Sequence, residues 1–290
     1  MKQYICLVIC FLYYCDSTTL FAKEKIHWQT IHWPPWMILE GKYKGQGFAD
    51  HLLQAAKQEL TEYEQIPVRM NWARFWLVIQ QGKNYCSVLS MKNPSREEIA
   101  YFSEPEAIVL NNELTVTKAT AQLLDNPVSI YIRSLLIDNR FHGGIETKRS
   151  YGVKIDQLLI KHNQNILPYA TSASSLLYML THKRIDYIIE YPIVVSYFTR
   201  NIQETSSLTS IKIKEIPEVF YGYLTCTKND WGKRVVNRWN QVLRKLKQTK
   251  QYQLLIESGY SKPDDIKTLR KYYPCFINNS LEQQCTTLHE

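Results

Sequence analysis

The stretch that decides the fold is residues 26–60, which read IHWQTIHWPPWMILEGKYKGQGFADHLLQAAKQEL. Residues 26–31 are typical of a β-strand, and Pro34 and Pro35 lie beyond it because proline has no backbone N–H for a strand ladder. After a glycine-bearing turn, Asp50 is a suitable N-cap for a helix with apolar residues at helical spacing. We therefore expect a strand, a loop and a helix in this order.

The same alternation of strands and helices continues along the chain. After the first helix, the sequence predicts a strand, a helix and two further strands at 66–70, 73–81, 86–89 and 106–116. A second series follows, with helices at 129–137, 150–162 and 174–181 and strands at 141–145, 166–170 and 185–189. A last strand at 219–227 leads into an amphipathic helix at 231–248. Strands that alternate with helices favour mostly parallel sheets covered on both faces, so we expect two α/β units.

Length and composition exclude several classes of protein. The chain has 290 residues, of which 45% are hydrophobic, and only 10 Gly and 11 Pro, which excludes a disordered or fibrous chain. This length is about twice that of a typical domain, so two lobes are expected. The net charge is +8, but the basic residues are scattered among acids rather than gathered in a block that tracks phosphates. A dedicated nucleic-acid-binding protein is therefore not expected.

The N-terminus has the order of a signal peptide. A Lys at position 2 precedes an apolar run at residues 4–15, which is too short to span a bilayer, and small Ala22 precedes the charged residues that begin at Lys23. The alternative is a retained anchor at the membrane interface. We expect residues 1–22 to be removed and a soluble exported protein to begin near Lys23.

Four cysteines remain in the expected mature chain: Cys86, Cys226, Cys275 and Cys285. In an oxidising compartment they allow three disulfide connectivities. Cys275 and Cys285 are close in sequence, and closing so short a loop is worth roughly 3 kcal/mol in the chain-entropy model. If those two are bonded, the remaining cysteines, Cys86 and Cys226, would pair with each other. The alternative is that Cys86 and Cys226 are small buried thiols. No close Cys or His pair with the spacing of zinc ligands precedes Cys275 and Cys285.

The sharpest motif in the chain is NPSREE at residues 93–98, followed by YFSEP at residues 101–105. Further characteristic pieces are WPPW at 33–36, GFAD at 47–50 and RID at 184–186. In this order the segments resemble the type II periplasmic solute-binding proteins, best known for the amino-acid receptors of ABC importers. The motif pair is similar to the Thr-x-Glu-Arg and Phe-Ser-x-Pro segments of that family.

The resemblance implies an α/β fold of two lobes, each a mostly parallel sheet flanked by helices. Two crossing strands, near 110–116 and 219–227, would join the lobes and let them close on a ligand like a hinge. The corresponding division is a first lobe at 23–112, a second lobe at 113–220 and a return to the first lobe at 221–262. Residues 263–290 are left as a polar, irregular C-terminal tail.

The family resemblance also implies a ligand site and no cofactor. Arg96 takes the place of the arginine that grips the ligand carboxylate, a role that suits a planar guanidinium. The alternative is a surface ion pair with Glu97, Glu98 or Glu104. In the second lobe, a turn at Ser150, Tyr151 and Gly152 would present backbone N–H groups to an anionic ligand group. An ordinary Ser-capped helix is the alternative there.

At the end of the late strand, the chain departs from the amino-acid receptors. They carry an Asp that neutralises the ligand ammonium, whereas this chain has Tyr191 in the matching place and Glu190 one position earlier. Successive strand residues point to opposite faces, so the offset matters, and an α-amino-acid ligand is not implied. Residues around Ser90 also differ from the family pattern, although Ser90 stays a candidate contact.

Aromatic and basic residues complete the expected cleft. Trp33 and Trp36 lie in the loop where the family places a ring against the ligand, and Arg74 lies at the turn into the second helix. Indole rings can stack on planar or cationic ligands, although each of these tryptophans could equally belong to the core.

We therefore expect a monomeric periplasmic protein that captures a small, carboxylate-bearing molecule for an inner-membrane permease or a sensor. One alternative is a periplasmic lyase of the cyclohexadienyl dehydratase type, with Glu190 as general acid. Another is an envelope protein with a degenerate cleft. No Ser-His-Asp or Cys-His set and no P-loop or dinucleotide glycine pattern is legible in the sequence.

Overall fold

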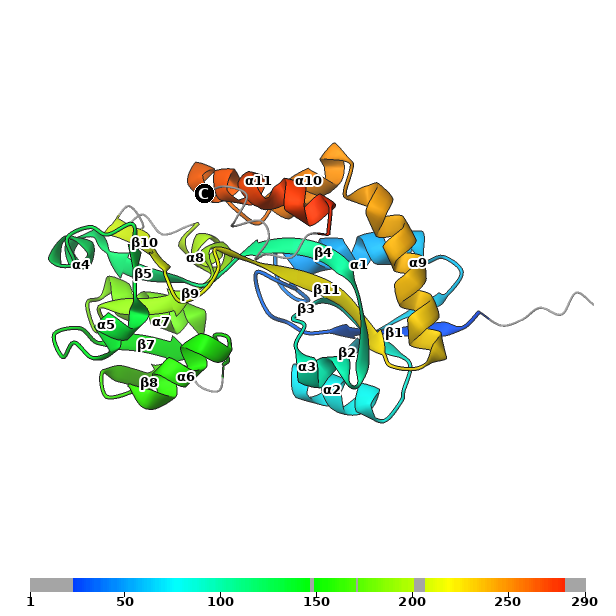
Figure 1. Cartoon of the computed structure of the whole chain (residues 1–290), viewed down its shortest axis with the longest axis horizontal. Coiled ribbons are helices and arrows are strands. Elements are labelled where there is room, and N and C mark those ends of the chain that lie inside the picture. The colour runs from blue at the N-terminus through cyan, green and yellow to red at the C-terminus, as the bar shows by residue number, and fades with distance from the viewer. Residues whose placement is uncertain (1–22, 147–148, 171, 201–206, 280–290) are drawn as a thin grey trace, which may run out of the picture.

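The computed structural model of the chain describes residues 23–146, 149–170, 172–200 and 207–279. It has two α/β lobes, each built on its own sheet, as Figure 1 shows. The expected signal peptide, residues 1–22, lies outside the described residues. Within the described part of the chain, no helix combines the length and the apolar character needed to cross a membrane.

The first lobe is built on a five-stranded sheet with the order β2-β1-β3-β11-β4. Its strands are β1 (Lys25–Thr30), β2 (Glu64–Arg69), β3 (Tyr85–Ser90), β4 (Ala100–Leu110) and β11 (Val219–Thr227). Its helices are α1 (Phe48–Glu59), α2 (Trp72–Gln80), α3 (Pro94–Glu97), α9 (Asp230–Leu246), α10 (Lys250–Glu257) and α11 (Pro263–Ile277). β1 is parallel to β2 and β3, whereas β11 is antiparallel to β3 and β4.

The second lobe is built on a six-stranded sheet with the order β6-β10-β5-β9-β7-β8. Its strands are β5 (Glu113–Thr117), β6 (Ser129–Ile130), β7 (Gly143–Glu146), β8 (Ile166–Ala170), β9 (Tyr187–Glu190) and β10 (Leu208–Ile213). Its helices are α4 (Lys118–Leu123), α5 (Ile132–Leu136), α6 (Val153–Lys161), α7 (Ala173–Thr181) and α8 (Pro192–Thr199). The sheets are mixed rather than mostly parallel, because strands next to the lobe crossings run antiparallel to their neighbours.

The chain crosses between the lobes at two places. The predicted long strand at 106–116 is in fact two strands, because β4 ends at Leu110 and β5 begins at Glu113 in the other sheet. Asn111 and Asn112 form the first crossing, and the Asn111 backbone N–H donates to the Glu218 carbonyl of the second crossing at 2.9 Å. The long paired strands β4 and β11 lead from these crossings into the first lobe (Figure 1).

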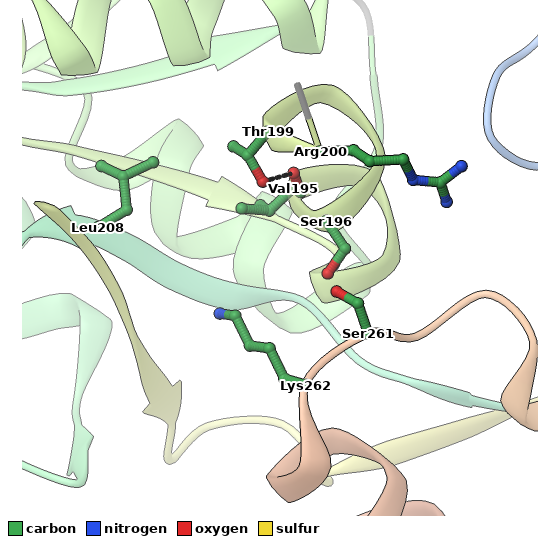
Figure 2. Close-up of a pocket in the computed structure, with 7 residues that line it drawn as sticks. All are labelled: Val195, Ser196, Thr199, Arg200, Leu208, Ser261 and Lys262. Carbon is green, nitrogen blue, oxygen red and sulfur yellow. Dashed lines mark hydrogen bonds between the residues drawn. The ribbon is translucent and has the colours of Figure 1, made fainter. Parts of the chain in front are cut away.

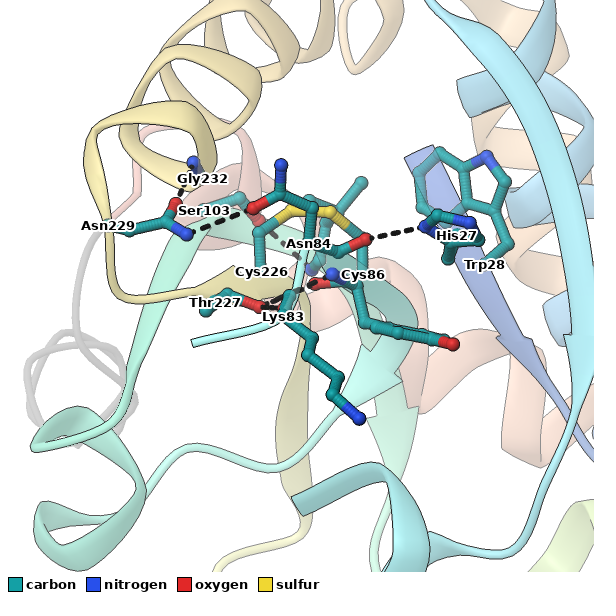
Figure 3. Close-up of a disulfide and its surroundings, with 12 residues drawn as sticks. His27, Trp28, Lys83, Asn84, Cys86, Ser103, Cys226, Thr227, Asn229 and Gly232 are labelled. Atoms are coloured by element: carbon teal, nitrogen blue, oxygen red, sulfur yellow. Dashed lines mark hydrogen bonds between the residues drawn. A yellow bond between two sulfur atoms is a disulfide. The ribbon is translucent and has the colours of Figure 1, made fainter. Parts of the chain in front are cut away.

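A disulfide joins Cys86 of β3 to Cys226 of β11 inside the first lobe, as Figure 3 shows. The two half-cystines are opposite each other in the antiparallel register, and neither is exposed to solvent. The pairing that elimination indicated is therefore confirmed. Cys285 lies outside the described residues, so the pairing of Cys275 with Cys285 stays a prediction.

The expectation of an irregular tail beyond Lys262 is wrong, because α11 occupies residues 263–277. Pro263 at the first helical turn and two following aspartates are a helix-start pattern that the polar composition hid. Leu269, Tyr272 and Phe276 of this helix are buried in the core of the first lobe. The buried Lys247 ammonium donates to the Phe276 carbonyl at 3.0 Å, so this segment belongs to the first lobe rather than to a tail.

Apolar side chains also join the lobes directly. Ile193 and Val194 of α8 belong to the same buried cluster as Trp36 and Phe48 of the first lobe. A Cβ on Gly259, after α10, would lie 2.2 Å from Ile193 Cδ1, so a larger residue there would have to displace the Ile193 side chain. The second lobe is thus seated against the first through α8.

Candidate functional site

A cavity of about 130 Å³ lies between the two lobes. Its first-lobe wall comes from the loop after β1, and its second-lobe wall comes from the ends of β7 and β9, the loop before α6 and the helices α7 and α8. The residues that line it are His32, Trp33, Pro34, Trp36, Glu146, Arg149, Ser172, Ala173, Glu190, Val194 and Phe198. Trp33, Trp36 and Glu190, which the sequence predicted as ligand contacts, are thus brought together.

The tryptophan loop is a tight, internally bonded turn. The Trp33 N–H donates to the Met37 carbonyl at 2.8 Å, the Trp36 N–H donates to the Trp33 carbonyl at 2.9 Å, and the peptide between the two prolines is cis. Asp50, expected as the N-cap of α1, instead lies in the first turn, where its carboxylate accepts from the backbone N–H of Gly47 at 2.9 Å. The turn leaves Trp33 37% exposed and Trp36 only 2% exposed.

Arg149 and Glu190 form a buried ion pair on the second-lobe wall. Arg149 Nη2 donates to Glu190 Oε1 at 2.7 Å and Nη1 donates to Oε2, while the Tyr191 N–H donates to Oε1 at 2.8 Å. Glu190 has no exposed side-chain surface. Burial lowers the pKa of Arg149, but the Glu190 carboxylate outweighs it and holds that pKa above its ordinary value.

Two tyrosine rings enclose this ion pair. The Arg149 guanidinium carbon lies 4.7 Å from the ring centroid of Tyr151 and 5.0 Å from that of Tyr191. Burial raises the pKa of Tyr151 to about 12, so its phenol stays neutral. The Tyr191 ring meets Trp36 edge-on, with centroids 5.5 Å apart, and so connects the ion pair to the first-lobe wall.

The predicted backbone anion site at Ser150, Tyr151 and Gly152 is arranged differently. The Ser150 hydroxyl donates to Asp156 Oδ2, and the Tyr151 N–H donates to Asp156 Oδ1 at 2.7 Å. The Gly152 N–H donates to Ser150 Oγ at 3.3 Å. These N–H groups are therefore engaged by side chains of the same turn. None of the three residues lines the cavity.

Arg96 lies on α3, outside the lining of the cavity. Its Nη1 donates to the Met91 carbonyl at 2.7 Å, and its guanidinium lies 4.3 Å from the Trp76 ring. Burial lowers the pKa of Arg96. The neighbouring Glu97 pairs with Lys92 at 2.8 Å rather than with Arg96.

Arg74 and Ser90 are also placed outside the cavity lining. The Arg74 N–H donates to the capping Asn71 at 2.9 Å, and the Arg74 side chain is exposed on the first turn of α2. Ser90 ends β3 and is 1% exposed, and its hydroxyl has no hydrogen-bond partner among the described residues.

Glu146 and Ser172 line the cavity although the sequence did not single them out. Glu146 ends β7, and Ser172 caps α7 by accepting from the Ser175 N–H at 3.3 Å. The sequence signal that could have found both is their position just after predicted parallel strands, where ligand sites gather at the carboxyl ends.

A larger cavity of about 330 Å³ lies beside α8, β10 and the start of α11 (Figure 2). Among the described residues, its charged lining residues are Arg200 and Lys262, and Figure 2 shows the Arg200 guanidinium directed away from Lys262. Lys262 already interacts electrostatically with the carboxyls of Glu113 and Asp265. Arg200 in its lining is the last described residue before 201–206. Both cavities have walls from both lobes, but the smaller one contains residues that the sequence predicted as ligand contacts and an enclosed ion pair, so it is the candidate site.

No protein-family model matches the sequence, and no curated protein matches it. Solved structures do match. A histidine kinase sensor domain, described as similar to periplasmic binding proteins, has a TM-score of 0.60 at 15% identity, with 81% of this chain and 95% of that chain covered. An ancestral cationic amino acid solute-binding protein has a TM-score of 0.61 at 17% identity, with 82% and 96% covered.

A third match is the L-cystine solute receptor of Neisseria gonorrhoeae in its unliganded open conformation, with a TM-score of 0.57 at 14% identity. Here 82% of this chain and 93% of the receptor are covered, so the likeness extends over both lobes. At such identities the likeness establishes the fold. The chain therefore has the two-lobed α/β fold of the type II periplasmic solute-binding proteins, as its sequence segments implied.

Proposed function

We propose that this protein is exported and captures a small solute between its two lobes, for an inner-membrane permease or for a sensor. The observation that carries the proposal is the cavity whose walls come from both lobes, with Trp33 and Trp36 on one side and the Arg149–Glu190 pair on the other. Its volume of about 130 Å³ is below the range of about 300–1,000 Å³ for drug-sized ligands, so the solute is small.

Arg96, which lies outside the cavity lining, is proposed to receive a carboxylate of the solute that extends beyond the cavity. Its guanidinium carbon lies 4.3 Å from the Trp76 ring centroid, and among the described residues its side chain donates one hydrogen bond, from Nη1 to the Met91 carbonyl. A guanidinium presents five N–H donors, so donors remain for a carboxylate at this edge of the first lobe.

The alternative of a lyase with Glu190 as general acid is disfavoured by the geometry. Both Glu190 oxygens accept hydrogen bonds from Arg149, and one also accepts from the Tyr191 N–H. A carboxylate held in this way stabilises the wall of the cavity rather than donating a proton to a substrate.

The experiment is native mass spectrometry of protein exported to the periplasm and purified without unfolding. We expect a bound small molecule in the wild-type protein and its loss from Trp33→Ala. Tyr131→Ala, which removes an exposed aromatic ring from the distant end of the second lobe, is the matched control and should keep the molecule. Equal retention by the Trp33 and Tyr131 variants would show that the cavity is not the binding site.

A further inference from the structure

The cation on the wall of the interlobe cavity is already paired with a carboxylate. Both terminal nitrogens of Arg149 are bonded to Glu190, and Nη2 also donates to Asn112 Oδ1 at 3.3 Å. The rings of Tyr151 and Tyr191 lie beside the guanidinium. The Arg149 side chain is 13% exposed, so an anion would meet a guanidinium that the Glu190 carboxylate already neutralises.

Glu146 adds a second carboxylate to the same wall. Its side chain is 27% exposed, and its Oε2 lies 3.7 Å from Arg149 Nη1. Two carboxylates, Glu146 and Glu190, thus share one guanidinium. Burial raises the pKa of Glu146, Arg149 lowers it and the nearby Glu190 charge raises it again, so this pKa stays above its ordinary value. Among the described residues that line this wall there are two carboxylates and one guanidinium.

The opposite wall consists of groups that attract cations. Trp33 and Trp36 have ring centroids 5.8 Å apart with planes inclined by 39°, and both line the cavity. The faces of indole rings carry negative electrostatic potential and bind ammonium groups. His32, also in the lining, accepts from the Leu39 N–H through Nδ1 at 3.1 Å, so this nitrogen is already paired.

From this juxtaposition we infer that the cavity binds a small organic cation, held between the Trp33 and Trp36 indoles and the Glu146 carboxylate. The inference rests on the proposed function and names the chemical class of the group that the second-lobe wall receives. It assigns Glu146, rather than Glu190, as the counter-charge. The volume of about 130 Å³ suits a substituted ammonium group with a short chain.

Three probes of nearly equal shape test the inference. They are choline, the uncharged alcohol 3,3-dimethylbutan-1-ol, in which tert-butyl replaces trimethylammonium, and tert-butylacetate, the anion of tert-butylacetic acid. Each is titrated by calorimetry into exhaustively dialysed full-length mature protein. We expect choline to bind at least about tenfold more tightly than the alcohol, and tert-butylacetate to bind least, because charge is the main difference between the probes.

Variants identify the residues responsible. Glu146→Gln should reduce choline affinity to that of the alcohol and leave the alcohol unchanged, whereas Trp33→Leu should weaken both. Glu59→Gln, which neutralises an exposed carboxylate on α1, is the matched control and should have no effect. Circular dichroism melting of each variant confirms that the fold is retained.

The inference is overturned if choline does not bind at millimolar concentration, if it binds no better than the alcohol, or if Glu146→Gln leaves its affinity unchanged. If tert-butylacetate binds and this binding is lost in Trp33→Leu, the ligand of the cavity is not a cation. Solute capture in the cavity would still be supported. The proposed function fails separately, through equal retention of the copurified molecule by the Trp33 and Tyr131 variants.

Discussion

Arg149, in the loop before α6, and Glu190, at the end of β9, form a two-point ion pair although 41 residues separate them in sequence. The pair lies on the cavity wall, and Asn112 of the first crossing accepts a hydrogen bond from the same guanidinium at 3.3 Å. The second-lobe wall is therefore tied to the crossing between the lobes. Any movement of the lobes that shifts Asn112 will be transmitted to the ion pair.

Removing one partner of this ion pair should destabilise the protein strongly. Glu190→Gln leaves Arg149 buried without its counter-charge, which costs about 3–5 kcal/mol of unfolding free energy. The double variant Arg149→Met with Glu190→Leu should recover much of that loss, because neither charge remains to be desolvated. Urea unfolding measures both changes.

The matched control for this prediction is the exposed pair between Arg140 and Asp138. Asp138→Asn should leave the urea midpoint nearly unchanged, because surface ion pairs contribute little. If Glu190→Gln unfolds at the same urea concentration as Asp138→Asn, the pair is not the structural element described here.

Glu106 should make stability depend on pH. Its side chain is fully buried in the first lobe, and its Oε1 accepts from the Leu89 N–H at 2.6 Å. Burial raises the pKa of Glu106 from 4.5 to about 8. Between these values the folded state binds more protons than the unfolded state, so the free energy of unfolding should fall as pH rises through this window.

Glu106→Gln should remove this part of the pH dependence, because the amide does not ionise. The measurement is the difference in urea midpoint between about pH 5 and about pH 8, compared for the wild type, Glu106→Gln and the exposed-site control Glu59→Gln. If Glu106→Gln shows the same difference in urea midpoint between the two pH values as the wild type, a carboxyl other than Glu106 is responsible for the pH dependence.

The sequence was sufficient for the fold where the hydrophobic pattern was strong. β11 is found at the predicted residues, and α9 is displaced by only one or two residues at each end, because its apolar stripe has clear helical spacing. The split between β4 and β5 was missed because residues 106–116 are rich in strand formers, and the break at Asn111 and Asn112 depends on which sheet each half joins.

The candidate site was only partly predictable. Trp33, Trp36 and Glu190 were singled out correctly as residues near one cavity, because the family resemblance places ligand contacts in the loop after the first strand and at the end of the late strand. The sequence did not indicate that Arg149 and Glu190 form an ion pair. The two residues are 41 positions apart, and no local pattern predicts a contact between their side chains. Glu146 was missed because a single acidic residue after a short predicted strand does not by itself indicate a ligand contact.

The Cys86–Cys226 disulfide should contribute much of the stability of the first lobe. It closes a loop of 140 residues, for which the chain-entropy model gives about 5 kcal/mol. Cys86→Ala with Cys226→Ala should lower the free energy of unfolding by several kcal/mol in non-reducing buffer. The control is the wild type measured in reducing buffer, and an unchanged urea midpoint in the double variant would contradict the prediction.

Arg96 should matter for a carboxylate-bearing solute and little for folding. Arg96→Ala removes the partner of a desolvated carboxylate and should weaken the binding of the copurified solute by about 2–5 kcal/mol, measured by calorimetry. Arg133→Ala, an exposed arginine in the second lobe, is the control. Affinity within twofold of the wild type in Arg96→Ala would mean that the solute carboxylate, if present, binds elsewhere.

If one small molecule is held by both lobes at once, a crystal structure of the protein with its copurified solute will show it. We expect electron density for the molecule in the interlobe cavity, in contact with Trp33 or Trp36 on one side and with Glu146 or Ser172 on the other. A molecule that contacts only one lobe, or that is bound elsewhere on the protein, would rule out capture between the lobes.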